Sequence, residues 1–251
     1  MKTVVIGGSG LIGSRVVSKL RERGHEVLAA SPVTGVNTIT GEGLSEAVAG
    51  ADVVVDVANS PSFEDAAVME FFKTSGRNLL AAEAAAGVKH HVALSVVGAE
   101  RLPDSGYLRA KVEQEKLIRE SGIPFTILHS TQFFEFAGAI VSSGTEGDTV
   151  HLPPALFQPI ASEEVVEALV EIIAGPPLNK VVEVGGPEKI GMDRFAREYM
   201  TMKQDKRKVV SDPKALYFGA IIDDRSLVPA DNARKGSIRY EEWIRMPGNL
   251  R

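Results

Sequence analysis

The sequence contains no cysteine, and this absence excludes three kinds of chemistry. Disulfide scaffolding, Cys-ligated zinc and thiol catalysis all require that residue. The five histidines form no metal-ligand spacing. The adjacent His90 and His91 precede a predicted strand, where neighbouring side chains point to opposite faces. We therefore expect no metal site, and the lack of cysteine fits a reducing compartment.

Long hydrophobic runs are also missing. No stretch reaches the ~18 to 20 uncharged apolar residues that a membrane span needs. The apolar N-terminus is interrupted by Gly7, Gly8 and Gly10 and is soon followed by basic residues, which is not typical of a signal peptide. We expect a cytoplasmic protein without a membrane partner.

Clustered positive charge is scarce, since the formal net charge is −5 and the one basic run, residues 203–208, is broken by Gln204 and Asp205. Non-specific affinity for nucleic acids comes chiefly from clustered Lys and Arg, so we expect no nucleic-acid partner. The Gly-x-Ser-x-Gly turn of many hydrolases is absent too, which disfavours that class.

Short β-branched runs alternate with longer segments of helical periodicity in the first half of the chain. The predicted strands are Thr3–Ile6, His25–Ala30, Asp52–Val57, His91–Ser95 and Phe125–His129, and the predicted helices are Leu11–Arg23, Val68–Ala86 and Tyr107–Ser121. This alternation is typical of βαβ units around a parallel sheet that is buried on both faces. We predict an α/β fold with a doubly wound parallel sheet.

A glycine-rich turn, Gly-Gly-Ser-Gly-Leu-Ile-Gly at residues 7–13, follows the first predicted strand and opens the first predicted helix. Gly7 permits the tight turn, Gly10 lets the backbone approach a pyrophosphate, and Gly13 allows close helix packing, while free N–H groups face the anion. A loop without a ligand is disfavoured, because strand, spacing and helix occur together. The predicted cofactor-binding residues of the turn are Gly7, Ser9, Gly10, Leu11, Ile12 and Gly13.

The end of the second predicted strand lacks the Asp or Glu that binds the ribose 2′-hydroxyl in NAD-specific sites. Residues 29–34 read Ala-Ala-Ser-Pro-Val-Thr. A missing carboxylate removes the repulsion toward a 2′-phosphate, and Ser31 and Thr34 can donate hydrogen bonds to one. No Arg stands there either, so the sequence favours NADP over NAD only modestly. Ala58, Asn59 and Ser60 follow the third strand beside the predicted ribose or nicotinamide, although a simple turn explains them equally well.

Tyr107 and Lys111 are four residues apart and therefore neighbours on one helix face. An ammonium near a phenol is expected to lower the tyrosine pKa toward the range useful for proton transfer. Ser95 ends a predicted strand, where open α/β sheets bind ligands. A surface Tyr–Lys pair and a strand-end cap are the alternative interpretation.

Together, the glycine turn, Ser95 and the Tyr-Leu-Arg-Ala-Lys segment at 107–111 resemble the short-chain dehydrogenase/reductase superfamily. Residues 120–128 (Glu-Ser-Gly-Ile-Pro-Phe-Thr-Ile-Leu) and 131–134 (Thr-Gln-Phe-Phe) are more narrowly similar to its atypical, NmrA-like branch, and the resemblance covers roughly residues 1–200. It implies a Rossmann fold in which Tyr107 gives a proton to a carbonyl, Lys111 holds the nicotinamide ribose and Ser95 hydrogen-bonds to the substrate oxygen. Many members of the branch lack the tyrosine and act as cofactor-sensing regulators, so its presence here favours catalysis.

Beyond Ser130 the alternation loosens, although a helix Ser162–Ala174 and a strand Lys180–Val184 are predicted. We predict a dinucleotide-binding core at residues 1–130 and a smaller C-terminal substrate-binding part at 131–251 with elements that return to the core. The predicted substrate-binding residues are Gln132, Phe133, Phe134 and Phe136, although aromatic clusters are more often core.

The sequence thus predicts an NAD(P)H-dependent oxidoreductase that moves a hydride to or from a carbonyl, quinone or polyketide-like small molecule. The alternative is a non-catalytic NAD(P)-sensing regulatory protein. The identity of the substrate and the oligomeric state are left open.

Overall fold

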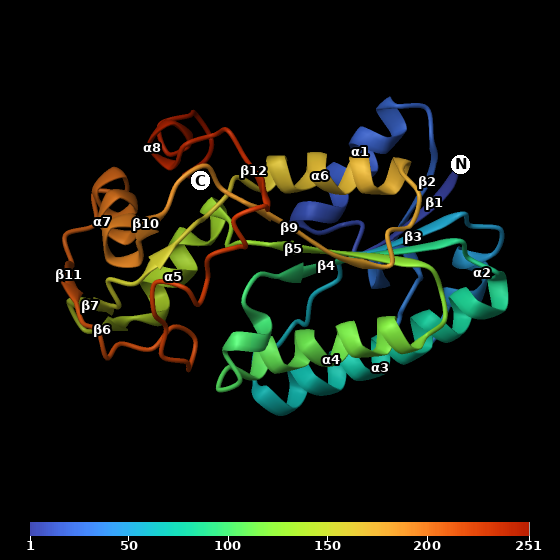
Figure 1. The fold of residues 1–251 in the computed structure, drawn as a ribbon, viewed down its shortest axis with the longest axis horizontal. Coiled ribbons are helices and arrows are strands. Elements are labelled where there is room, and N and C mark those ends of the chain that lie inside the picture. The colour runs from blue at the N-terminus through green and yellow to red at the C-terminus, as the bar shows by residue number, and fades with distance from the viewer. Residues whose placement is uncertain (251) are drawn as a thin grey trace. The chain divides into compact units, whose positions relative to one another are not determined.

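Seven short strands, of which β3 and β9 are the richest in valine, form one sheet in the computed structural model, which describes residues 1–250 (Figure 1). The strand order is β12-β9-β5-β4-β3-β1-β2. The strands are β1 (Lys2–Ile6), β2 (Glu26–Ala30), β3 (Val53–Asp56), β4 (His90–Val96), β5 (Phe125–Ser130), β9 (Lys180–Gly185) and β12 (Arg234–Lys235).

The order in which strands are added to the sheet reverses at β1. Strands β2 and β3 both pair with β1 in parallel, on opposite sides of it, and β4 continues in parallel beyond β3. The predicted doubly wound sheet is therefore confirmed. In such sheets ligands bind outside the carboxyl ends of the strands, where the winding reverses; this places the candidate site at the ends of β1, β3 and β4.

Helices cover both faces of this sheet (Figure 1). Helices α1 (Leu11–Glu22) and α6 (Ser162–Ala174) lie on one face, and α3 (Asp65–Ala86) and α4 (Gly106–Glu120) lie on the other. Lys19 and Arg23, at the end of α1, form ion pairs with Glu167 of α6. The helix predicted to begin at Val68 begins three residues earlier, at Asp65.

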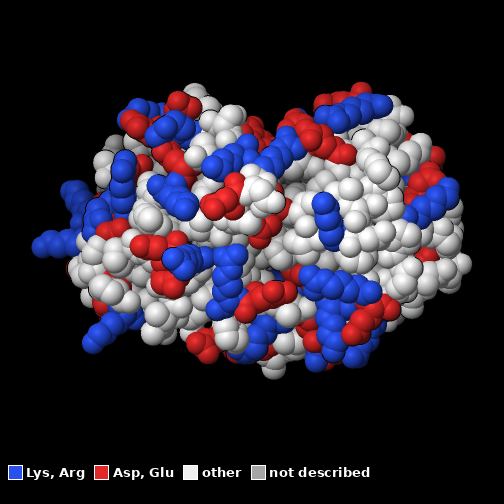
Figure 2. All heavy atoms as spheres, in the orientation of Figure 1, with Lys and Arg blue, Asp and Glu red and all other residues white. Residues whose placement is uncertain are grey.

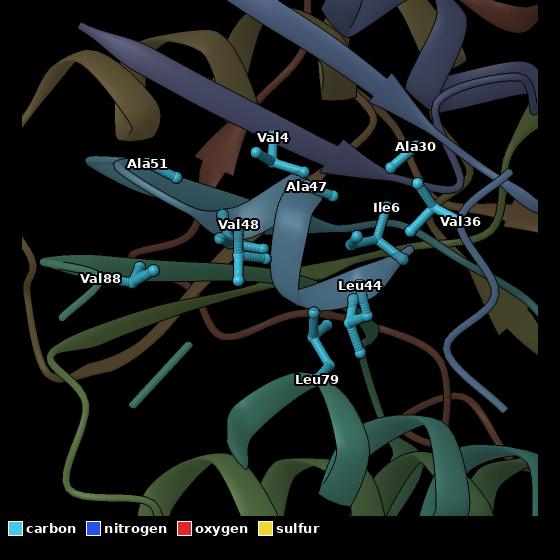
Figure 3. Packing of buried hydrophobic residues seen from close by; sticks show 11 residues of the cluster. Val4, Ile6, Ala30, Val36, Leu44, Ala47, Val48, Ala51, Leu79 and Val88 are labelled. Carbon is cyan, nitrogen blue, oxygen red and sulfur yellow. The ribbon is translucent and has the colours of Figure 1, made fainter. Parts of the chain in front are cut away.

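A short helix that the sequence pattern did not predict closes the core beside β1. Helix α2 (Leu44–Val48) buries Leu44, Ala47 and Val48 against Ile6 and the α3 residue Leu79 (Figure 3). Isolated helices this short are unstable in water, so tertiary packing rather than helix propensity maintains α2.

The chain divides into two compact units. The first consists of residues 1–95, 106–129 and 165–182, and the second of residues 96–105, 130–164 and the described residues from 183 onward. Most of α6 and the start of β9 thus belong to the first unit, although they follow the predicted boundary at residue 130.

The second unit is built from short elements around an aromatic core. Its strands are β6 (Thr145–Glu146), β7 (Thr149–Leu152) and β11 (Lys208–Ser211) in one sheet, and β8 (Leu156–Phe157) and β10 (Ile190–Gly191) in another. Its helices are α5 (Ala137–Ser143), α7 (Met192–Met202) and α8 (Tyr240–Trp243). Short 3-10 turns span Ala99–Arg101 and Phe134–Phe136, and a third, in the first unit, spans Pro32–Thr34. The rings of Phe134, Phe195, Tyr240 and Trp243 pack together, with 4.1 Å between the Phe195 and Tyr240 centroids.

None of the helices within residues 1–250 has the length and apolar character needed to cross a bilayer. Acidic and basic side chains are interspersed over the face shown in Figure 2, and neither sign forms a large patch there.

Candidate active site

The glycine turn joins β1 to α1, and three of its glycines, Gly7, Gly8 and Gly13, are required by packing. Gly7 has a φ of +79°, and a Cβ there would lie 2.8 Å from the backbone of Ala58. A Cβ on Gly13 would overlap the Gly7 carbonyl oxygen. A Cβ on Gly8 would lie 2.8 Å from the backbone of Ala29 and Val5. These three positions let the helix begin directly against the strand ends.

Gly10 differs, because it has an ordinary φ of −80° and a Cβ there would meet only the Gly7 oxygen, at 3.3 Å. It is the N-cap of α1, and neither a side-chain cap nor an acidic residue satisfies the first turn. The first N–H groups of a helix lack intrahelical acceptors and attract anions. Ser9, Gly10 and Leu11 are exposed, and this exposed helix start fits the pyrophosphate of a dinucleotide.

Ser31 and Thr34 form a compact turn after β2. The Thr34 hydroxyl accepts from the Ser31 N–H at 2.9 Å and lies 2.9 and 3.1 Å from the Ser31 and Ala29 carbonyl oxygens. This hydroxyl is thus engaged within the turn. The Ser31 hydroxyl lies 3.4 Å from that of Thr34.

The segment after β3 packs close to the glycine turn. The Ala58 N–H donates to Asp56 Oδ1 at 3.1 Å, and the neighbouring Ala58 backbone is the group that a Gly7 side chain would strike. Asn59 is exposed, and Ser60 is buried. The structure thus brings Ala58 to the predicted pyrophosphate turn, with Asn59 and Ser60 next to it in the chain.

Tyr107 lies in the first turn of α4, with its ring between two phenylalanines. Its centroid is 5.6 Å from that of Phe63 and 6.1 Å from that of Phe72. Burial raises the pKa of Tyr107 to about 12. The expectation that Lys111 lowers this pKa is wrong, because no charge offsets the burial.

Lys111, one turn further along α4, is buried. Its Nζ donates to the Leu94 carbonyl oxygen at 2.9 Å and to Gln114 Oε1, and it lies 4.5 Å from the Phe72 centroid. Burial lowers the pKa of Lys111 to about 8, while the charges of Asp56 and Glu115 oppose that shift. Tyr107 and Lys111 therefore contact the same Phe72 ring, as neighbours on one helix face.

Ser95 is held by a residue outside the expected triad. Its hydroxyl donates to Glu115 Oε1 at 2.6 Å, and His129 Nε2 lies 2.8 Å from the same oxygen. Arg119 donates to the other carboxylate oxygen at 2.8 Å. Burial alone would raise the pKa of Glu115, but the hydrogen bond and charge of His129, helped by Ser95 and Arg119, hold it below its ordinary value.

The predicted substrate-binding residues lie in the second unit and differ in burial. Phe134 fills the aromatic core, whereas Phe136 is 44% exposed and stacks on Phe133 with 5.1 Å between centroids. Gln132 is buried, and its Oε1 has no hydrogen-bond partner within residues 1–250; the same is true of Thr131 Oγ1. Buried polar atoms without partners are rare in native proteins, so each calls for an explanation such as a bound water or ion.

Four residues near the site were missed by the sequence analysis: Asp56, Phe63, Gln114 and Glu115. Gln114 and Glu115 follow Lys111 at the i+3 and i+4 spacing that shares a helix face, and this spacing was the available signal. Asp56 is the one charged residue in β3, whose other residues are valines. Nothing in the sequence pattern distinguishes Phe63.

Comparison with known proteins gives a family match and more distant relatives. A family model described as NAD(P)H-binding matches residues 7–176. The chain is 29% identical over 209 residues to the (4-alkanoyl-5-oxo-2,5-dihydrofuran-3-yl)methyl phosphate reductase of Streptomyces griseus subsp. griseus, which covers 74% of this chain and 68% of that protein. It is 24% identical over 149 residues to the photosystem II assembly factor Ycf39 of Synechocystis sp., over 54% of this chain and 46% of that protein, so it spans less than half of the latter.

A solved structure shares the fold. The crystal structure of a short-chain dehydrogenase/reductase superfamily protein from Agrobacterium tumefaciens with bound NAD matches with a TM-score of 0.69 and 16% identity, over 96% of this chain and 94% of that chain.

Proposed function

The chain belongs to the NAD(P)H-binding family, and on that premise we propose that it is an NAD(P)H-dependent oxidoreductase of the short-chain dehydrogenase/reductase type. Its substrate is a carbonyl, quinone or polyketide-like small molecule. The observation that carries the proposal is the buried Lys111 ammonium, held against the Leu94 carbonyl at the end of β4, one helical turn from Tyr107.

Tyr107 is suited to give a proton. With a pKa raised to about 12 by burial, the phenol stays protonated at neutral pH and can donate to an oxygen that becomes negatively charged during reduction. The bound nicotinamide would supply the hydride.

Lys111 has a donor left for a ligand. An ammonium carries three N–H donors, and the Leu94 carbonyl and the Gln114 amide accept two of them. The third suits a ribose hydroxyl, in agreement with the role that the family resemblance implies. Its positive charge also stabilises negative charge that develops nearby.

The Ser95 hydroxyl is oriented differently from the role that the resemblance implies. Its proton is directed to Glu115, so in this geometry its hydroxyl can only accept a hydrogen bond from a substrate. That arrangement suits the hydroxyl group of an alcohol product. We retain Ser95 in the proposed site in this accepting role. For Gln132, Phe133 and Phe136 we keep the separate proposal that they bind substrate.

We further propose a modest preference for NADPH, supported by the absence of an acid from Leu28 to Thr34. Thr34 is engaged within its own turn, and Ser31 is only 5% exposed, so the proposed preference rests on the missing acid rather than on either hydroxyl.

A second candidate function is cofactor sensing without turnover. It is favoured by the Ser95 hydroxyl, which is turned to Glu115, and by the likeness to an assembly factor over about half of the chain.

Oxidation of NADPH in the presence of aldehydes, quinones and enones, followed by absorbance, distinguishes the two functions. On a substrate found in this way, Tyr107→Phe should lower turnover by ~10² to 10⁴, the usual value of general acid catalysis, with cofactor affinity nearly unchanged. Tyr240→Phe is the matched control, because the buried Tyr240 hydroxyl has no partner within residues 1–250. Tight cofactor binding without turnover on any substrate class would instead favour the sensor.

A further inference from the structure

Lys111, Gln114 and Asp56 form a buried polar chain that runs from α4 to β3. The three side chains are 3%, 2% and 5% exposed. The Gln114 amide oxygen accepts from the Lys111 ammonium, and its Nε2 donates to Asp56 Oδ2 at 2.7 Å. The proton transfer proposed above does not use Gln114 or Asp56.

We propose that Gln114 is a positioning residue, whose single amide group joins the Lys111 ammonium to Asp56 and so fixes that ammonium at the carboxyl end of β4. The inference rests on the proposed function only where it gives Lys111 a part in cofactor binding. The chain of hydrogen bonds stands independently of it.

An amide is the side-chain group that suits this place. Its oxygen accepts from an ammonium while its NH2 donates to a carboxylate, and these two partners determine its orientation. An apolar side chain would leave a lysine donor and an Asp56 oxygen unpaired in the core, which is costly. A carboxylate would face Asp56 with a second acceptor of the same charge.

The charges around Lys111 leave its ammonium sensitive to this contact. The carboxylates that face it are Asp56 on β3 and Glu115 on its own helix, whereas α3 contributes the uncharged Phe72 ring and β4 the Leu94 carbonyl. Burial outweighs both carboxylates and lowers the Lys111 pKa to about 8. Removal of the Gln114 oxygen should lower this pKa further, because hydrogen bonds to the charged form favour that form.

The chain also reaches the cofactor turn. Asp56 accepts from the Ala58 N–H through its other oxygen, and Ala58 lies against Gly7. Gln114 therefore links the lysine to the strand end that packs on the pyrophosphate-binding glycines.

The test compares Gln114→Met, which keeps the length but removes the amide, with Lys116→Met on the exposed face of the same helix. The titration of Lys111 is followed by NMR of [13Cε]-lysine protein without cofactor, with the resonance assigned by Lys111→Arg. We expect the Lys111 midpoint to fall by about one pH unit or more in Gln114→Met and to stay in place in Lys116→Met. NADPH affinity should fall as the pH rises and Lys111 loses its proton. In Gln114→Met this fall should occur at a lower pH than in the wild type.

If Gln114→Met does not fold, Gln114→Leu serves instead, because it is similar in size and offers Lys111 no acceptor. We expect the same downward shift. An unchanged Lys111 midpoint in the folded variants overturns the positioning role, even in an active reductase. Absence of reductase activity would refute the proposed function without moving the lysine titration, so the two failures are distinguishable.

Discussion

Ser95 and Glu115 are joined by a 2.6 Å hydrogen bond in which the serine hydroxyl donates to the carboxylate. The same carboxylate also binds His129 and Arg119, so Glu115 is both buried and fully paired. A side chain expected to contact the substrate is therefore held in place by the helix that carries Tyr107 and Lys111.

The Glu115 pairing should make folding stability depend on pH. Its folded pKa lies below the ordinary value, so Glu115 stabilises the fold above its unfolded pKa of ~4.3, and this stabilisation is lost as the pH falls through the folded pKa. We expect Glu115→Gln to cost about 1–3 kcal/mol near pH 7 and progressively less below pH ~4. Urea unfolding over a pH series measures the difference.

Glu120→Gln, at an exposed position of the same helix, controls for the loss of one negative charge and should change stability by less than ~0.5 kcal/mol. A stability difference between wild type and Glu115→Gln that stays constant down to pH 3 would show that Glu115 is not held as a carboxylate.

Gly10 and Gly13 should respond to the same substitution in opposite ways. A Cβ at position 10 would meet only the Gly7 carbonyl oxygen, at 3.3 Å, so Gly10→Val should lower the melting temperature much less than Gly13→Val. Cofactor affinity should fall at least about tenfold, ~1.4 kcal/mol, because the side chain occupies the place of the pyrophosphate. Gly13→Val overlaps the Gly7 oxygen and should destabilise the fold itself. Calorimetry and thermal melting separate the two effects, and a Gly10→Val protein that binds NADPH like the wild type would refute the assignment of the turn.

Local patterns explain why the glycine turn was predictable and the Glu115 contacts were not. The turn follows from a strand, a glycine spacing and a helix that are contiguous in the chain, so short-range sequence contains all the information. The Ser95–Glu115 bond depends on how α4 rotates against β4, and in the sequence Glu115 is one of many charged residues on that helix. Helix α2 and the strands of the second unit are too short to show a period.

The pKa of Tyr107 was mispredicted for a related reason. The spacing to Lys111 indicates proximity along the helix, but the ammonium turns inward to Leu94 and Gln114. Burial between Phe63 and Phe72 then dominates.

Ser31→Asp should reverse the proposed cofactor preference. Wild type is expected to bind NADPH more tightly than NADH. A carboxylate at the end of β2 repels a 2′-phosphate and can bind a ribose hydroxyl instead. We expect NADPH affinity to fall by about tenfold or more, while NADH affinity falls less or improves. Ser31→Asn matches the size of the aspartate variant without its charge, and it should change the affinities for both cofactors alike. Parallel calorimetric titrations measure both affinities. Tighter binding of NADH than of NADPH by the wild type would refute the proposed preference for NADPH.

Phe63 should control the ionisation of Tyr107. Its ring is 65% exposed yet packs on the Tyr107 ring, and burial is what raises the Tyr107 pKa to about 12. Phe63→Ala should admit water and move this pKa down toward the ordinary value of ~10. Because the removed ring is mostly exposed, the loss of stability should be less than about 1 kcal/mol. Tyrosinate absorbance measures the titration, with the Tyr107 contribution isolated by subtracting the same variant carrying Tyr107→Phe.

Phe63→Leu is the matched control, since it keeps an apolar cover and should leave the Tyr107 pKa between the two values. Circular dichroism over the same pH range establishes that the fold persists during the titration. A lowered Tyr107 pKa in Phe63→Ala, accompanied by a change in turnover, would connect this exposed ring to the proposed reduction. If Tyr107 in Phe63→Ala still titrates at about 12, its burial comes from Phe72 and the helix beneath it. Phe63 would then have no part in raising the Tyr107 pKa.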